Sequence, residues 1–273
     1  MNDDMAARAL EHVLITGATS GIGRACAQKL IARGVRVSVL DITPPDYDVA
    51  AFEQLDLSDP ASITQALSAV QALDPIDALF NIAGVPPKPD QQKSILCINW
   101  AGQVMLTKGL LDRIRAGGAI VNMASKAGGR WMQNIEEVRH LMAHLTPAQI
   151  DNFLAETDID ATRAYNLSKE ALIVWTMASA KALKDRQLRM NCVSPAAVDT
   201  GILDDFKTAF GPMVDKNLAM TGRPGHPEEV ADVALFLASP ESHWLRGVDI
   251  TVDGGMSAFM QTEQLKLDDT LLQ

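Results

Sequence analysis

Basic residues are scarce in this chain of 273 residues. It has 24 Lys and Arg but 34 Asp and Glu, which gives a formal net charge of −10. The few basic residues form no run along the sequence. Nucleic acids and anionic membrane surfaces are usually bound through basic patches. We therefore expect neither a nucleic acid nor a membrane as a partner.

Cysteine is scarce too, since Cys26, Cys97 and Cys192 are far apart and odd in number. Their spacing fits neither a disulfide framework nor a metal or redox motif. No segment approaches the roughly 18 uninterrupted apolar residues of a membrane-spanning helix. The acidic start of the sequence lacks the basic and apolar regions of a signal peptide, so a cytoplasmic location is expected.

Apolar residues make up 47% of the chain. They occur in short β-branched runs that alternate with helical stretches. The predicted strands are 12–16, 35–40, a third ending at Leu55, 77–82, 119–124, 189–193 and 248–252. The predicted helices follow the first turn as far as Arg33 and then cover 60–73, 91–115, 162–184 and 227–237. This alternation predicts an α/β fold, a Rossmann-like, doubly wound, seven-stranded parallel sheet. No linker divides the chain, so residues 1–273 are expected to form one domain.

A glycine-rich run, Thr16-Gly17-Ala18-Thr19-Ser20-Gly21-Ile22-Gly23, directly follows the first predicted strand and opens a helix. Glycines at such a turn let the backbone approach a pyrophosphate, which then lies at the helix N-terminus. The spacing is wider than the Gly-x-Gly-x-x-Gly pattern, but the strand–turn–helix context is that of a dinucleotide site.

Asp41 ends the second predicted strand and is followed by Ile42 rather than by a cation. A carboxylate at this place accepts hydrogen bonds from ribose hydroxyls and repels a 2′-phosphate, which favours NAD over NADP. The alternative is an Asp that only forms the turn after the strand.

Ser125, Tyr165 and Lys169 form the candidate proton-transfer group. Tyr165 and Lys169 are four residues apart, so on a helix they project from one face. An ammonium beside a phenol favours the phenolate and lowers its pKa, and a serine hydroxyl can hold a carbonyl or alcohol oxygen meanwhile. Taken alone, the pair favours the simpler interpretation of a half-exposed Tyr above a solvated Lys.

Together these motifs resemble the short-chain dehydrogenase/reductase family over almost the whole chain. Further matching residues are Asp56-Leu57, Asn81-Ile82-Ala83-Gly84, Asn99, Ser194-Pro195, Thr200 and Asp253-Gly254-Gly255. Two positions depart from the family pattern, because Ile82 replaces a second asparagine and Ala196 replaces a glycine after Pro195.

The resemblance implies that Tyr165 is the acid/base, that Ser125 positions the substrate oxygen, and that Asn99 holds a water that relays protons to Lys169. Lys169 would also bind the nicotinamide ribose. The cofactor-binding set that it implies is Gly17, Ser20, Gly21, Ile22, Gly23, Asp41, Ile42, Asp56, Leu57, Asn81, Ala83, Gly84, Tyr165, Lys169, Pro195, Val198 and Thr200. Of these, Asp56 and Leu57 would contact the adenine, and the last three would fix the carboxamide side of the nicotinamide.

An insertion, about 128–160, separates Ser125 from Tyr165 and is expected to form two helices. Asn134 would cap the first, which runs to about Leu145, and Thr146-Pro147 would open the second, which runs to about Glu156. Trp131 and Met132 are candidate substrate contacts, although they could equally pack the insertion on the body. His140 and His144 share a helix face, but no third ligand accompanies them, so no metal is expected. Because the family often forms its subunit interface here, a homodimer is favoured over a homotetramer.

A flap over the substrate is expected at 201–222, where Phe206 and other apolar residues suit an apolar alcohol or ketone. Ala196 is a further candidate substrate contact. The insertion resembles that of the 3α-hydroxysteroid dehydrogenase/carbonyl reductase and coniferyl-alcohol dehydrogenase subgroup. The resulting hypothesis is an NAD(H)-dependent oxidoreductase that interconverts an apolar secondary or aryl alcohol and its ketone or aldehyde. A catalytically silent NAD-binding regulator and a sugar-nucleotide epimerase or dehydratase remain the alternatives.

Overall fold

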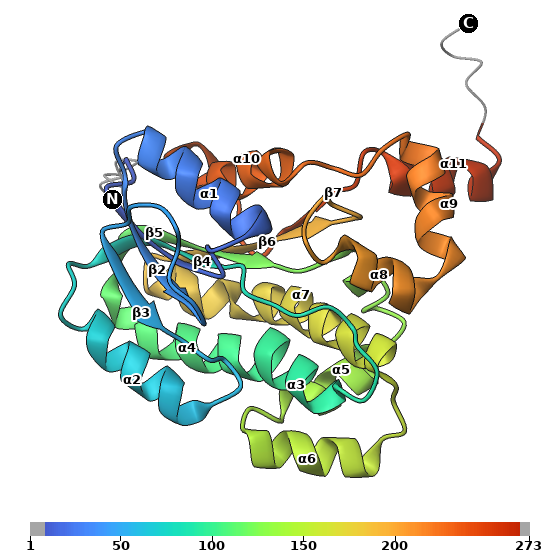
Figure 1. Ribbon diagram of the computed structural model, residues 1–273, viewed down its shortest axis with the longest axis horizontal. Coiled ribbons are helices and arrows are strands. Elements are labelled where there is room, and N and C mark those ends of the chain that lie inside the picture. The colour runs from blue at the N-terminus through green and yellow to red at the C-terminus, as the bar shows by residue number, and fades with distance from the viewer. Residues whose placement is uncertain (1–8, 268–273) are drawn as a thin grey trace, which may run out of the picture.

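The computed structural model describes residues 9–267 and contains a seven-stranded, all-parallel sheet of order β3-β2-β1-β4-β5-β6-β7 (Figure 1). The strands are β1 (His12–Thr16), β2 (Arg36–Asp41), β3 (Ala51–Gln54), β4 (Ile76–Asn81), β5 (Ile114–Met123), β6 (Arg189–Pro195) and β7 (Asp249–Val252). The order reverses between β1 and β4, and ligands of such sheets bind beside that point, at the carboxyl ends of the strands. The predicted fold class is confirmed.

Helices cover both faces of the sheet, so the central strands are buried on both sides. Helices α1 (Gly21–Ala32) and α10 (Pro227–Ala238) pack together over one face, and α2 (Pro60–Val70), α4 (Gln103–Leu110) and α7 (Ala161–Asp185) lie on the other (Figure 1). The remaining helices are α3 (Gln92–Leu96), α5 (Ile135–Met142), α6 (Pro147–Glu156), α8 (Leu203–Phe210), α9 (Pro212–Thr221) and α11 (Met256–Leu265). Among residues 9–267, no helix combines the length and the apolar character needed to cross a membrane.

Local sequence explains where several helices begin. Asp59 caps α2 by accepting a hydrogen bond from the amide of Ala61 at 2.9 Å, with a proline next in the chain. Helix α6 starts at Pro147 after Thr146, as predicted, and a capping box between Thr146 and Gln149 stabilises this start. Asn134 does precede α5, but the prediction that it caps this helix is wrong, because its side chain makes no capping bond.

The predicted helix 91–115 is interrupted and ends earlier than expected. A π-helical turn, η1 (Cys97–Gly102), separates α3 from α4, and a short 3-10 turn at 111–113 leads directly into β5. Gly117 and Gly118 therefore lie inside the strand rather than after the helix. The pairing of β4 with β5 shifts register near these glycines, and Gly117 has φ +85. These glycines therefore mark an irregularity in the strand.

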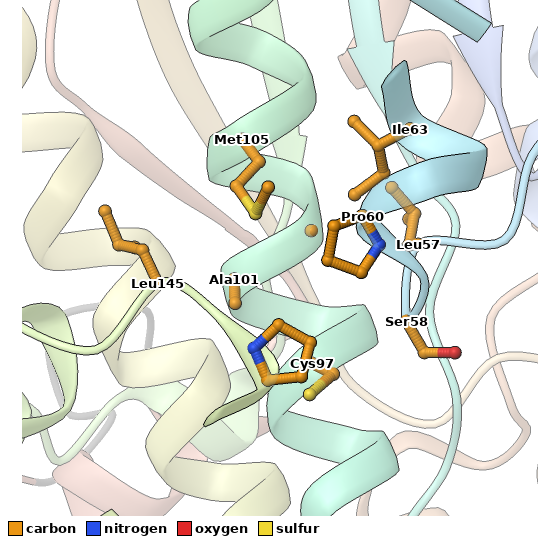
Figure 2. A pocket seen from close by; sticks show the side chains of 10 residues that line it. Leu57, Ser58, Pro60, Ile63, Cys97, Ala101, Met105 and Leu145 are labelled. Carbon is orange, nitrogen blue, oxygen red and sulfur yellow. The ribbon is translucent and has the colours of Figure 1, made fainter. Parts of the chain in front are cut away.

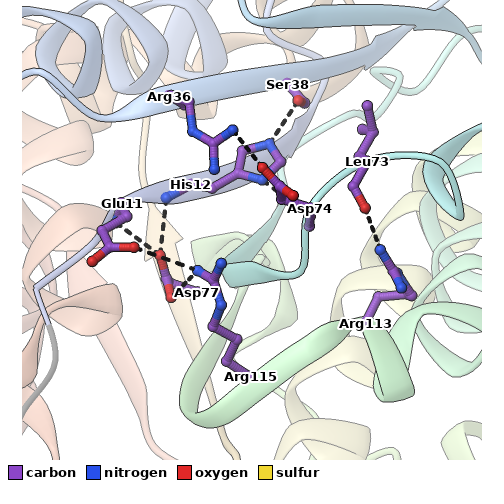
Figure 3. Close-up of polar contacts among 9 residues, drawn as sticks. All are labelled: Glu11, His12, Arg36, Ser38, Leu73, Asp74, Asp77, Arg113 and Arg115. Carbon is purple, nitrogen blue, oxygen red and sulfur yellow. Dashed lines mark hydrogen bonds and ion pairs between the residues drawn. The ribbon is translucent and has the colours of Figure 1, made fainter.

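A cluster of charged side chains lies at the amino ends of β1, β2, β4 and β5, the edge opposite the predicted site (Figure 3). Asp77 accepts hydrogen bonds from Arg115 at 2.8 Å and from the amide of His12 at 2.9 Å. The imidazole of His12 is buried between the carbonyl of Asp74, at 3.1 Å, and the hydroxyl of Ser38, at 2.8 Å. These contacts fix the relative positions of four strands.

His12 is expected to make the fold less stable in mild acid. Burial lowers the pKa of His12 below its ordinary value of 6.5, so the folded state binds fewer protons than the unfolded chain below that pH. This contribution is fully present above pH 6.5 and is lost as pH falls through the folded-state pKa. Thermal unfolding between pH 7.5 and 5 should show a shallower loss of stability in His12→Gln than in the wild type. The matched substitution at the exposed His243 should keep the wild-type slope.

Candidate active site

The carboxyl ends of β1 and β4 are joined by the buried hydroxyl of Thr16. It accepts hydrogen bonds from the amides of Ile82 at 3.0 Å and Ala83 at 3.2 Å, and it donates to the carbonyl of Phe80 at 3.3 Å. This link fixes the segment after β4 against the glycine-rich turn that follows β1.

The glycine-rich turn leaves no room for side chains at the predicted positions. A Cβ on Gly17 would lie 2.6 Å from the Cα of Ala83, and one on Gly23 would lie 2.0 Å from the carbonyl oxygen of Gly17. Ser20 precedes α1 but makes no side-chain capping bond to it. Thr200 approaches from beyond β6, since its Cγ2 would be 3.2 Å from a Cβ on Gly21. The turn, the start of α1 and the segment after β6 therefore meet, and this cradle fits a dinucleotide pyrophosphate.

Asp41 lies beside that turn, and its carboxylate accepts hydrogen bonds from the amide and the hydroxyl of Thr19, at 3.0 and 2.8 Å. Its other oxygen accepts from the amide of Ile42 at 2.7 Å. The sequence did not identify Thr19 as a partner, because its distance from Asp41 along the chain concealed the contact.

The nearest basic residue on α1, Arg24, is already neutralised. Its guanidinium pairs with Asp46 at 2.7 Å and lies 5.3 Å from the ring centroid of Tyr47. The Tyr47 hydroxyl in turn donates to the carbonyl of Ala18 at 2.6 Å. Tyr47 thus holds the loop after Asp41 on the glycine-rich turn, and Arg24 is paired with Asp46 of that loop.

The other predicted cofactor residues lie around the same edge of the sheet. Asp56 uses Oδ1 to accept hydrogen bonds from the amide and hydroxyl of Ser58, and Leu57 is buried against Gly102. Asn81 is fully buried and donates to Thr107 and Asn122, so it stabilises the sheet. The adenine contacts stay predictions. Val198, in the segment after β6, forms an isolated parallel bridge with Gly225.

Helix α7 brings Tyr165 and Lys169 to the carboxyl end of β5, where Ser125 begins a short 3-10 turn, η3 (Lys126–Gly128). The Nζ of Lys169 donates to the carbonyl of Met123 at 2.9 Å and lies 5.7 Å from the ring centroid of Tyr165. The Ser125 hydroxyl is close enough to Tyr165 to lower the pKa of its phenol. The three residues separated in the sequence are thus side by side.

Burial is the main influence on the pKa values of Tyr165 and Lys169. It raises the pKa of Tyr165 to about 12, against the opposing effect of the Ser125 hydrogen bond, and it lowers the pKa of Lys169 to about 8. The expected lowering of the Tyr165 pKa by its neighbour is therefore not observed. Both shifts penalise an isolated buried charge, whereas a phenolate beside an ammonium is stabilised by mutual attraction.

Asn99 lies within the π-helical turn η1 and is fully buried. Its side-chain amide is occupied at both ends by Val85, accepting from the amide at 2.8 Å and donating to the carbonyl at 2.9 Å. A Cβ on Gly84 would be 3.1 Å from Asn99 Oδ1 and 3.5 Å from Lys169 Nζ, so Asn99 and Lys169 flank the same backbone position. A relay water at residue 99 stays a prediction.

Two phenylalanines of helix α8, which lies in the predicted flap, pack against the ring of Tyr165. The ring of Phe206 is 5.3 Å from that of Tyr165 at 70°, and the ring of Phe210 is 6.3 Å away at 74°. An ion pair of 3.2 Å between Lys88 and Asp205 holds α8 to the segment after β4. Phe206 therefore lies beside Tyr165, as does Phe210, while substrate contact by Phe206 stays a prediction.

The other candidate substrate contacts differ in exposure. Trp131 packs against the apolar cluster that contains Tyr165, whereas Met132 is 68% exposed. Ala196 is partly buried, and its amide donates to the carbonyl of Val252 at 3.1 Å. Substrate contact by these three residues stays a prediction, with the geometry favouring Trp131 over Met132.

A small crevice separates the insertion from the body of the protein (Figure 2). It is too narrow to enclose a water molecule, and it is lined by residues that include Leu57, Cys97, Met105, Leu145 and Pro147. Ligand pockets usually enclose roughly 300–1,000 Å³. This crevice holds no catalytic side chain and marks only the junction of α6 with η1 and α2.

His140 and His144 are close but do not form a metal site. Nε2 of His140 is 3.0 Å from Glu156 Oε2, and Nδ1 of His144 is 2.7 Å from the carbonyl of His140. Both rings pack against Phe153. Within residues 9–267, no group of three or more side chains has the arrangement of a metal site.

Comparison with known proteins agrees with this geometry. Residues 11–136 match the family model described as short chain dehydrogenase, and residues 149–257 match one described as enoyl-(acyl carrier protein) reductase. The chain is 36% identical to a coniferyl-alcohol dehydrogenase of a Pseudomonas species, over 91% of this chain and 97% of the relative. It is 31% identical to the D-threitol dehydrogenase of Mycolicibacterium smegmatis, over 89% of this chain and 91% of the relative.

Among solved structures, the fold resembles a 3-alpha-hydroxysteroid dehydrogenase of a Pseudomonas species complexed with NADH. The TM-score is 0.81 and the identity 29%, over 93% of this chain and 99% of that one. The segment between the two matched family models, 137–148, lies inside the insertion.

Proposed function

Since the chain belongs to the short-chain dehydrogenase/reductase family, we propose that it uses NAD(H) to interconvert an apolar secondary or aryl alcohol and its ketone or aldehyde. One observation carries the proposal: Phe206 packs edge-on at 5.3 Å against Tyr165, which itself is grouped with Ser125 and Lys169. A proton-transfer group enclosed by aromatic rings favours an apolar substrate over a charged one.

In the oxidative direction, the Ser125 hydroxyl holds the substrate oxygen while Tyr165 takes its proton. The carbinol C–H electron pair leaves as a hydride, for which bound NAD supplies the acceptor, and the C=O bond forms. Lys169 stays positively charged beside the phenolate and compensates for its burial. The reverse sequence, with Tyr165 donating the proton, reduces the carbonyl compound.

The preference for NAD over NADP rests on the surroundings of Asp41. Its carboxylate lies against the glycine-rich turn, and the nearby Arg24 is paired with Asp46. A 2′-phosphate placed here would meet a negative charge and no free cation on this stretch of α1.

A substrate panel tests the proposed reaction. Aryl, steroid and alicyclic alcohols would be incubated with NAD, and formation of the reduced cofactor would be followed by absorbance. The coniferyl-alcohol and hydroxysteroid relatives make the first two classes the leading candidates. Turnover confined to polyols such as D-threitol, the class named for another relative, would contradict an apolar substrate.

Phe206→Ala is expected to weaken substrate binding more than it changes kcat, because Ser125, Tyr165 and Lys169 are all retained. An edge-to-face aromatic contact is worth about 0.5–1.5 kcal/mol beyond its buried area, and about 1.4 kcal/mol corresponds to a tenfold change in affinity. KM for an aryl alcohol should therefore rise by about tenfold. The same substitution at Phe236, which is 43% exposed on α10, is the matched control. An unchanged KM in Phe206→Ala would show that α8 does not contact the substrate.

We further propose a homodimer rather than a homotetramer. The insertion helix α6 packs on α3, and Lys93 pairs with Asp151 across this contact at 2.7 Å. The insertion thus covers a surface that the family resemblance assigns to subunit contacts. Light scattering on the purified protein tests this, and a tetramer would contradict it.

A further inference from the structure

We propose that Glu170 is a positioning residue that clamps the insertion to the catalytic helix and thereby holds Ser125 at its working separation from Tyr165 and Lys169. The inference rests on the proposed function, because it concerns the geometry of that same reaction. It adds a buried charge network that the proton transfer itself does not use.

The carboxylate of Glu170 is 1% exposed and is held from both ends of the insertion. One oxygen accepts a hydrogen bond from Nδ2 of Asn134 at 2.7 Å, and the other accepts from Arg163 at 2.7 Å. Asn134 lies at the start of α5, and Arg163 lies in the first turn of α7, where the chain returns from the insertion. Both ends of the inserted segment therefore converge on one side chain.

Arg163 extends this clamp to the first turn of helix α5. Its guanidinium also donates twice to Glu137, from Nε at 3.1 Å and from the terminal nitrogen at 2.8 Å. Two carboxylates thus share one guanidinium at a place where Glu170 has almost no contact with water. Removing a partner from a buried charge is costly, so this network resists movement of α5 relative to α7.

The clamp lies next to the backbone that carries the catalytic residues. Glu170 follows Lys169 directly, and the turn η3 after Ser125 rests on the same place. A Cβ on Gly128 would lie 2.8 Å from the carbonyl carbon of Lys169 and 3.0 Å from the amide nitrogen of Glu170. Movement of the insertion away from α7 would therefore shift the Ser125 segment against Tyr165 and Lys169.

The test is Glu170→Gln in the full-length protein, assayed with NAD and the best alcohol of the substrate panel. The glutamine oxygen can still accept from Asn134, but its NH₂ group would face the donors of Arg163. Because a misplacement of about 1 Å can cost roughly a hundredfold in rate, kcat should fall by roughly tenfold to a hundredfold. KM for NAD should stay at the wild-type value, since the cofactor cradle is not touched.

The pH profile separates positioning from simple loss of folded protein. Movement of Ser125 away from Tyr165 removes the hydroxyl that lowers the pKa of Tyr165, so the apparent pKa in the kcat/KM profile should rise. Loss of folded protein would lower the measured activity by the same factor at every pH and would leave that apparent pKa unchanged. The double variant Arg163→Gln/Glu170→Gln should recover part of kcat, because two neutral amides can pair.

Glu136→Gln is the matched control, because this residue lies on the same helix α5 but pairs with Arg139 in solvent. It should retain the wild-type kcat. If Glu170→Gln fails to fold, Asn134→Ala keeps both charges and should lower kcat in the same direction by a smaller factor. A wild-type pH profile and kcat in the folded Glu170 or Asn134 variant would overturn the clamp. A wild-type protein inactive on every alcohol would instead overturn the proposed function.

Discussion

Replacing Tyr165 by phenylalanine is expected to reduce turnover by about a hundredfold to ten-thousandfold, the usual contribution of a positioned general acid or base. The substitution removes only the hydroxyl that takes the substrate proton. The ring would stay packed between Phe206 and Phe210, so the fold and the apolar surroundings should be retained. Initial rates with the best alcohol of the panel give the size of the loss.

The binding of NAD by the inactive variant decides how the loss is interpreted. The glycine-rich turn and Asp41 lie on β1, β2 and α1, away from the Tyr165 hydroxyl, so the dissociation constant for NAD should stay close to the wild-type value. Calorimetry provides this measurement. Tyr47→Phe, at the only other tyrosine in the chain, should keep kcat. Substantial turnover by Tyr165→Phe would refute its role as acid/base.

The sequence predicted the parts of the site that depend on local geometry. A turn such as Gly17 to Gly23 must follow a strand and precede a helix, because only that arrangement brings glycine backbone to a helix N-terminus. Tyr165 and Lys169 are likewise set by helical spacing within α7. For the same reason all seven strands were found, although the ends of several elements differ by a few residues.

Long-range contacts were not accessible from the sequence. Glu170 looks like an ordinary helical glutamate until α5 and Arg163 are placed around it. The pKa of Tyr165 was misjudged for a related reason: proximity to Lys169 follows from spacing, but the extent of burial depends on α8 and the whole sheet. The interruption at η1 and the glycines inside β5 depend on strand pairing that no local pattern shows.

Replacing Asp41 by alanine is expected to narrow the preference for NAD over NADP by about tenfold to a hundredfold. Hydrogen bonds to a charged group contribute about 1.5–3 kcal/mol, and about 1.4 kcal/mol corresponds to a factor of ten. Most of the change should be a higher KM for NAD, because the ribose hydroxyls lose their acceptor. Loss of the contacts to Thr19 would loosen the turn for both cofactors equally and would leave their ratio unaffected.

Whether Arg24 is paired with Asp46 determines how far the preference for NAD over NADP can shift. In Asp41→Ala the guanidinium stays paired with Asp46 and stacked on Tyr47, so NADP gains relief from repulsion but no new cation. Adding Asp46→Ala should free Arg24 for a 2′-phosphate and shift the ratio of kcat/KM values further towards NADP. Asp46→Ala alone should remain selective for NAD, because Asp41 still repels the phosphate. If Asp41→Ala leaves the ratio unchanged, the carboxylate is only the turn-forming residue after β2, and selectivity must arise elsewhere in the cradle.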